Sequence, residues 1–148
     1  ANSLILDSAL KILGSRGYEL LIEHGIDTAA RFAEEIRRRP DFQLVTEPAL
    51  NILTYRICPT ELHRRLAHAA ADEKARINTR INEINRTVQR LQREAGKSFV
   101  SRTTLRTDGE DGADTVVLRA VIMNPMTDIR VLREILDEQE AIFRRRFF

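Results

Sequence analysis

The sequence predicts an α+β fold in which a small antiparallel sheet of about four strands has helices packed on one face. Two observations lead to this fold class. Segments with helical and with strand periodicity follow one another in the order α-α-β-β-α-β-β-α. The strands also come as two adjacent pairs, which favours antiparallel pairing between neighbours. The chain has 148 residues, 43% of them apolar, and no internal repeat or linker, so it is expected to form one compact unit.

A helix is expected first, because apolar residues recur at helical spacing between residues 6 and 21. Gly14 and Gly17 lie on or beside this apolar stripe, and a glycine inside a helix costs about 1 kcal/mol. Three interpretations account for the two glycines: the close approach of another backbone, a kink, or a break between two helices. The sequence leaves all three open.

A second helix is expected after Gly25, which loosens the chain. Asp27 or Thr28 is expected to cap this helix. Its last turn contains Arg37–Arg39, where cations stabilise the negative end of the helix dipole, and Pro40 ends it. Its inward face is expected to consist of Phe32, Ala33 and Ile36.

The first pair of strands follows directly. Residues 42–46 alternate in character, and Pro48 is expected to interrupt this strand before a second strand at residues 50–57. A polar helix is then predicted over residues 61–95, with Gly96 as its C-terminal stop. Its apolar residues repeat at steps of four and three, which fits a helix packed on a sheet or a short helix pair in a dimer: Ile77, Ile81, Ile84, Val88 and Leu91.

The second pair of strands is predicted at residues 99–105 and 115–123, and a loop containing residues 108–112 joins them as a hairpin. Thr127 or Asp128 is expected to cap a final helix. One face of that helix is apolar and consists of Ile129, Leu132, Leu136 and Phe143.

Arg119 is the residue that does not fit an ordinary strand. It stands between apolar neighbours on a strand whose two faces are otherwise apolar, so its guanidinium is expected to be at least partly covered. A covered guanidinium needs an anion, because desolvating an unpaired charge costs several kcal/mol. Three readings follow: an internal Asp or Glu partner, a snorkelling side chain at an edge, or the carboxylate or phosphate of a ligand.

Composition excludes several function classes. The net charge of +2 comes from interspersed basic and acidic residues, so neither a nucleic acid nor a membrane is expected as a partner. The single cysteine, Cys58, excludes an internal disulfide framework and is typical of the cytoplasm. No metal site is expected, since His24, His63 and His68 do not have zinc-ligand spacing with Cys58.

Four pieces of sequence together resemble a known family. Leu118-Arg119 followed by Asn124-Pro125-Met126-Thr127 resembles the LR-(x)4-NP-x-T signature of the group II pyridoxal-phosphate-dependent amino-acid decarboxylases. Three earlier segments resemble the same family in order and spacing: residues 13–18, residues 47–59 with the Tyr55-Arg56 pair, and residues 96–101. The resemblance extends from about residue 10 to residue 137.

This resemblance implies the C-terminal small domain of a fold-type I decarboxylase, with residues 1–40 leading from a missing large domain and residues 41–148 forming the small domain. It implies an acidic substrate, glutamate or aspartate, with an aromatic amino acid as the alternative, and Arg119 as the residue that binds the substrate carboxylate. Pyridoxal 5'-phosphate would be bound by the large domain, since Lys11, Lys74 and Lys97 stand outside the family's His-Lys motif. No catalytic or cofactor-binding residue is therefore expected in this chain. The fragment alone should be inactive, and the full-length enzyme is expected to be a homodimer.

Two other functions compete with this one. A ferredoxin-like binding module fits the order of the later elements, although aromatic residues, which stack RNA bases, are only 5% of the chain. A structural role is the other alternative, with the first helix and residues 77–91 as docking surfaces, and we expect the isolated chain to self-associate. The acidic loop 107–114 and the tail 144–148 have no role that the sequence assigns.

Overall fold

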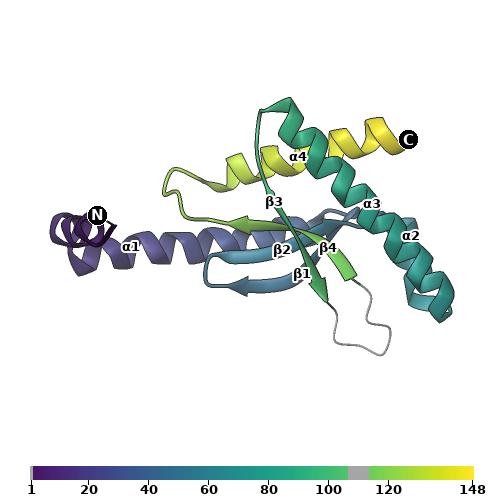
Figure 1. Ribbon diagram of the computed structural model, residues 1–148, viewed down its shortest axis with the longest axis horizontal. Helices are drawn as coiled ribbons and strands as arrows, with labels where there is room; N and C mark the ends of the chain where they lie inside the picture. Colours follow the sequence, from purple (N-terminus) through teal and green to yellow (C-terminus); the bar gives the residue numbers. More distant parts are fainter. Residues whose placement is uncertain (1, 107–113) are drawn as a thin grey trace.

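The computed structural model describes residues 2–106 and 114–148 and has the predicted α+β architecture (Figure 1). Its one four-stranded sheet has the order β1-β2-β4-β3, and every pair of neighbours is antiparallel. The elements in chain order are α1 (Asn2–Arg38), β1 (Phe42–Ala49), β2 (Ile52–Ile57), α2 (Thr60–His68), α3 (Ala71–Ala95), β3 (Ser101–Arg106), β4 (Asp114–Val121) and α4 (Ile129–Phe147).

Helix α1 includes both helices predicted before Pro40 and has a kink at Gly14, which is one of the interpretations left open for that glycine. The chain leaves helical geometry at Gly14 (φ 67°, ψ 174°), so the interruption is at that glycine. The predicted loosening at Gly25 is wrong, as are the predicted caps at Asp27 and Thr28, which lie inside the helix. A Cβ atom at Gly25 would be 3.0 Å from the backbone oxygen of Ile122. Glycine is therefore needed there for close packing.

The bounds of all four strands differ from the predicted ranges by one to three residues, and two of these differences have a clear cause. Strand β1 continues through Pro48 to Ala49, because β1 is an edge strand and one side of it needs no N–H donor. Its register against β2 shifts twice, between Leu44 and Thr46 and between Thr46 and Ala49. Strand β2 begins at Ile52 because Leu50 adopts a positive φ of 56° in the turn.

The single helix predicted over residues 61–95 is in fact two helices. Ala69 and Ala70 are extended, and Ala69 packs against a small apolar cluster of Cys58, Ile77 and Ile81. The stop at Gly96 is confirmed, since Gly96 is left-handed with φ 68° and its N–H donates to the last carbonyls of α3. The predicted β3–β4 hairpin is also confirmed. Its loop, residues 108–112, lies outside the described residues.

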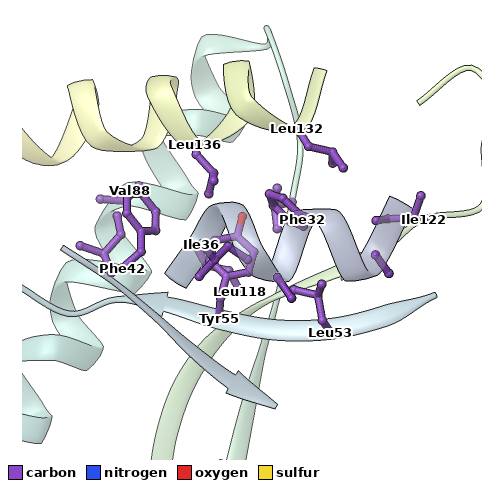
Figure 2. Packing of buried hydrophobic residues seen from close by; sticks show 14 of the residues in the cluster. Phe32, Ile36, Phe42, Leu53, Tyr55, Val88, Leu118, Ile122, Leu132 and Leu136 are labelled. Carbon is purple, nitrogen blue, oxygen red and sulfur yellow. The ribbon is translucent and has the colours of Figure 1, made fainter. Parts of the chain in front are cut away.

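The core lies between one face of the sheet and the helices (Figure 2). The C-terminal half of α1 packs on β1 and β2, α3 packs mainly on β4, and α4 lies on α1 and α3. The predicted inward residues of α1 are buried, as are Leu132, Leu136 and Phe143 of α4. The core side chains labelled in Figure 2 come from helices and strands alike, and they include Phe32, Ile36, Phe42, Leu53, Tyr55, Val88, Leu118 and Leu136.

Asparagines of α3 complete the sheet where β2 and β4 separate. The last paired residues of these strands are Tyr55 and Leu118. Beyond them, Asn85 accepts from the N–H of Ile57 and donates to its carbonyl, both at 2.8 Å. Asn82 accepts from the N–H of Val116 at 2.8 Å. Helix α3 therefore supplies the hydrogen bonds that a neighbouring strand would otherwise provide.

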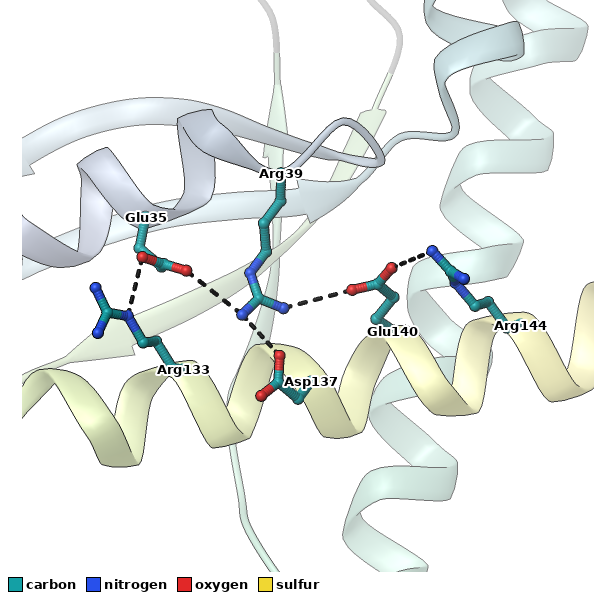
Figure 3. A network of polar contacts seen from close by, with 6 residues as sticks. All are labelled: Glu35, Arg39, Arg133, Asp137, Glu140 and Arg144. Atoms are coloured by element: carbon teal, nitrogen blue, oxygen red, sulfur yellow. Dashed lines mark hydrogen bonds and ion pairs between the residues drawn. The ribbon is translucent and has the colours of Figure 1, made fainter.

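Ion pairs join the end of α1 to α4 (Figure 3). Arg39 donates to Asp137 at 2.7 Å and lies 3.5 Å from carboxylate oxygens of both Glu35 and Glu140. Arg133 of α4 approaches Glu35 at 3.0 Å. Because the Arg39 side chain is only 15% exposed, this network is less screened by solvent than an isolated surface pair.

Candidate functional site

An open hollow of about 390 Å³ lies where β4 leads into α4. The residues of the family signature meet there, since Arg119, Asn124 and Thr127 all line it. Strand β3 and the segment before it contribute Ser101 and Phe99. The rest of the lining is mainly apolar and includes Tyr55, Val121, Ile122, Val131, Leu132 and Ile135.

Arg119 is exposed, so the prediction that its side chain is covered is wrong. Its strand lies between β2 and β3, but the guanidinium extends from the face opposite the Leu118 core. Its Nε donates to the Ser101 hydroxyl at 3.3 Å, and that hydroxyl donates to the Arg119 carbonyl at 3.0 Å. Within the described residues Arg119 makes no ion pair, so the expected internal carboxylate is not found among them.

The turn after β4 positions the start of α4. Asn124 accepts from the N–H of Met126 through its side chain and from the N–H of Thr127 through its carbonyl, each at 2.9 Å. Asp128, one of the two predicted caps, then accepts from the N–H groups of Arg130 and Val131. Those hydrogen bonds, that of Val131 first, lower the pKa of the Asp128 carboxyl below its ordinary value. The signature therefore builds a hydrogen-bonded turn that places Asn124 and Thr127 at the hollow.

A covered guanidinium was predicted at Arg119, but the covered one on this sheet is that of Arg56. It is 9% exposed, and its partners are two amides: Gln43 accepts at 2.7 Å and Asn78 at 3.2 Å. Burial lowers the pKa of Arg56. The strand that contains Arg56 was predicted. The contact with Asn78 of α3 was not, because the pattern of a strand does not indicate where a helix packs on it.

The lysines and the potential metal ligands of the described part lie away from this hollow. Lys11, Lys74 and Lys97 are exposed and do not line the hollow. Cys58 is buried beside His63, with 3.7 Å between Sγ and Nδ1, and burial raises the pKa of its thiol. Among these residues no three His, Cys, Asp or Glu side chains are arranged so that they could hold a metal ion. None of the helices in residues 2–106 and 114–148 has both the length and the hydrophobicity needed to cross a bilayer.

Comparison with known proteins identifies relatives of one kind. No family model matches the chain. Aspartate 1-decarboxylase of Aliivibrio fischeri is 39% identical over 140 residues, which are 95% of this chain and 26% of the relative. Aromatic-L-amino-acid decarboxylase of Bacillus atrophaeus is 27% identical over 134 residues, which are 90% of this chain and 24% of the relative.

The fold of this chain is also found in solved structures. The crystal structure of mouse CSAD in apo form superposes with a TM-score of 0.77 at 20% identity, over 93% of this chain and 26% of that one. The chain thus spans about a quarter of the length of the proteins that it matches. Its homologues are amino-acid decarboxylases, and its fold is that of one part, about a quarter, of group II pyridoxal-phosphate-dependent decarboxylases.

Proposed function

We propose that this chain is the C-terminal part of a pyridoxal-phosphate-dependent decarboxylase of an acidic amino acid, in which Arg119 binds a substrate carboxylate. The proposal rests on the surroundings of the Arg119 side chain. It lines the hollow, its Nε is directed by Ser101, and among the described residues no carboxylate neutralises it. An arginine in that state can hold a carboxylate with its two remaining nitrogens in a bidentate fork.

The need for such a residue follows from the reaction. Pyridoxal phosphate, when bound, would supply the electron sink for decarboxylation, and that chemistry would require the substrate to be held in one orientation. A guanidinium on a strand of a packed sheet is a fixed point for that purpose. The 39% identical relative is named for aspartate, which has a second carboxylate to bind.

The cofactor and its lysine belong, in this proposal, to a large domain outside this chain. The three lysines of the chain are exposed and away from the hollow, which supports that division. The N-terminal half of α1 supports a docking role, because it exposes a set of large apolar side chains: Leu4, Ile5, Leu6, Leu10, Ile12, Leu13, Leu20, Leu21 and Ile22. We propose that this surface packs on the large domain, and that the active enzyme is a cytoplasmic homodimer.

An aromatic amino acid is the second candidate substrate. The apolar lining of the hollow would suit an aromatic ring, and Phe99 beside it is 64% exposed. The Bacillus relative is also named for aromatic substrates. An aromatic side chain has no carboxylate, so this candidate predicts a smaller role for Arg119 in substrate affinity.

The test is carbon dioxide release by the full-length enzyme from aspartate, glutamate and an aromatic amino acid, for wild type and Arg119→Met. We expect activity on an acidic substrate, and a loss of roughly two orders of magnitude in kcat/KM for Arg119→Met. Hydrogen bonds to charged groups contribute about 1.5–3 kcal/mol each, which accounts for that size. The cofactor's absorbance should be unchanged in the variant.

Arg76→Met is the matched control, since Arg76 is an exposed arginine of α3 outside the hollow. It should retain wild-type kinetics. Equal activity of Arg119→Met and wild type would refute the role of Arg119. A preference of the wild-type enzyme for the aromatic substrate would favour the second candidate.

A further inference from the structure

The positive charge of the chain is concentrated near the end of α3. Residues 86–102 contain five of the 24 Lys and Arg residues and one of the 22 Asp and Glu residues. The rest of the chain therefore has 19 basic and 21 acidic residues, so the excess of positive charge is local. An uneven distribution of this kind creates a local potential that attracts anions.

The arginines of this segment surround one hollow. Arg86, Arg90 and Arg93 recur at steps of four and three along α3 and so share a face of that helix. Arg102 approaches from β3, and the four arginines line a hollow of about 210 Å³ together with Thr87 and Gln89. Gln89 also donates to the carbonyl of Val100 at 3.3 Å, which holds the chain entering β3 against the helix. The two sides of the hollow are thus fixed relative to each other.

Most of this charge is not neutralised within the described part of the chain. Arg90 pairs with Glu94 at 2.9 Å. Arg86, Arg93 and Arg102 make no ion pair with any carboxylate of residues 2–106 and 114–148. Arg80, earlier on the same helix, is neutralised by contrast, because it pairs with Glu83 at 2.7 Å. Repulsion among the three unneutralised arginines would be relieved by a bound anion.

The size and chemistry of the hollow favour a phosphate group. Its volume is below the roughly 300–1,000 Å³ of pockets that enclose organic ligands. A phosphate presents three or more acceptor oxygens to several guanidinium groups at once, whereas a carboxylate presents two. The Thr87 hydroxyl adds a neutral donor to the charged ones.

We propose that the hollow between α3 and β3 binds a phosphate group, either of free phosphate or pyrophosphate or of a small phosphorylated metabolite. This site is separate from the one at Arg119, because the two hollows have no lining residue in common. The inference therefore does not depend on the substrate of the proposed decarboxylase.

Isothermal titration of the full-length protein saturated with pyridoxal phosphate tests this site, since the cofactor's own phosphate position is then filled. Pyrophosphate, orthophosphate and glycerol phosphate are titrated separately, at low ionic strength and again in 0.5 M sodium chloride. We expect binding that weakens with salt, because exposed charges are screened. The order of affinities distinguishes free phosphates from a phosphorylated metabolite.

The double variant Arg93→Gln with Arg102→Gln should bind the tightest of these anions at least about tenfold more weakly, because each guanidinium donates charge-assisted hydrogen bonds. Arg93→Lys keeps the charge and should lose part of the affinity, since it lacks the planar fork. Arg64→Gln removes an exposed arginine of α2 that pairs with Glu61, and should leave the affinity unchanged. Absence of binding, or equal affinity in the double variant and wild type, would overturn the proposal.

Discussion

Two arginines on the same face of the sheet have opposite environments. Arg119 lies directly opposite Thr54, and Arg56 is two residues further along β2, so their side chains leave the sheet on the same side. Arg56 is covered and donates to two amides, whereas Arg119 is exposed and, among the described residues, has one hydroxyl as its side-chain partner. This difference favours a structural role for Arg56 and, in the proposed function, a ligand-binding role for Arg119.

Ser101 is expected to act as a positioning residue for Arg119, given the proposed function. Its hydroxyl joins the Nε and the carbonyl of Arg119, which restricts the rotamer of the guanidinium. In the full-length enzyme, Ser101→Ala should raise KM for the acidic substrate about three- to tenfold, the size of one net hydrogen bond, with little change in kcat. Steady-state kinetics measure this, and Ser101→Thr should restore the wild-type KM. A uniform loss of activity with unchanged KM would argue against positioning.

Asp128 is expected to make the stability of α4 depend on pH. Hydrogen bonds from Val131 and Arg130 lower the pKa of its carboxyl in the folded state from the ordinary value of 3.8. The contribution to stability is therefore complete above about pH 4 and is lost as pH falls through the lowered pKa. Thermal melts of wild type and Asp128→Asn should differ less at pH 3 than at pH 7. A difference that stays constant across this range would contradict the linkage.

Helix α3 shows how one element satisfies several others. Its amide side chains recur at steps of four and three and reach β2, β4, the start of β3 and α4: Asn78, Asn82, Asn85, Gln89 and Gln92. A second stripe, with Ile84 and Val88, enters the hydrophobic core beside them. The helix therefore contributes both apolar contacts and side-chain hydrogen bonds to the sheet.

Removing one of these amides should be costly. Asn85 is fully buried, and Asn85→Ala leaves both the N–H and the carbonyl of Ile57 without their partner. We expect a loss of about 2–4 kcal/mol in the free energy of unfolding, since each unsatisfied buried group costs about 1–3 kcal/mol. Urea denaturation measures it. Glu83→Ala on the same helix, which removes only an exposed ion pair, should change stability by less than about 1 kcal/mol.

The elements that follow local periodicity were predictable, and those decided by distant contacts were not. The hairpin of β3 and β4, the stop at Gly96 and the cap at Asp128 depend on neighbouring residues, and all three were predicted correctly. The continuation of α1 through Gly25 depends on the carbonyl of Ile122, which is far along the chain. The exposure of Arg119 likewise depends on which face of the sheet the helices cover. The amide stripe of α3 was present in the sequence, and its heptad spacing could have indicated a buried polar seam.

At the scale of the whole molecule, the C-terminal end of α1 is bound to α4, and the N-terminal end of α1 projects (Figure 1). Arg39 at the end of α1 contacts Glu35, Asp137 and Glu140, which ties α1 to α4 (Figure 3). The N-terminal half of α1 extends away from the sheet beyond the kink at Gly14 (Figure 1). We call the projecting part of α1 with its exposed apolar side chains, residues 4–22, the helical arm. A packed domain with such an arm has the form expected of a domain that packs on a larger one.

We expect the isolated 148-residue chain to self-associate through this arm. Leu10 and Leu20 are 46% and 51% exposed, and apolar surface of this extent favours contact with another copy. Light scattering at tens of micromolar should detect a particle larger than a monomer. The double variant Leu10→Ser with Leu20→Ser should shift it towards the monomer, and Phe148→Ser, at the exposed C-terminal end of the chain, should not. A strictly monomeric wild-type chain would refute the expectation.

The irregularities of β1 have a consequence for how such copies can meet. An exposed sheet edge is a template on which another chain can add a strand, the first step towards aggregation. Pro48 and the two register shifts deprive the β1 edge of a regular row of donors and acceptors. The opposite edge, β3, presents the charges of Arg102 and Arg106, which repel a second copy. Both edges are thus protected against strand addition. Copies of this domain are therefore expected to contact each other through the helical arm rather than through the sheet.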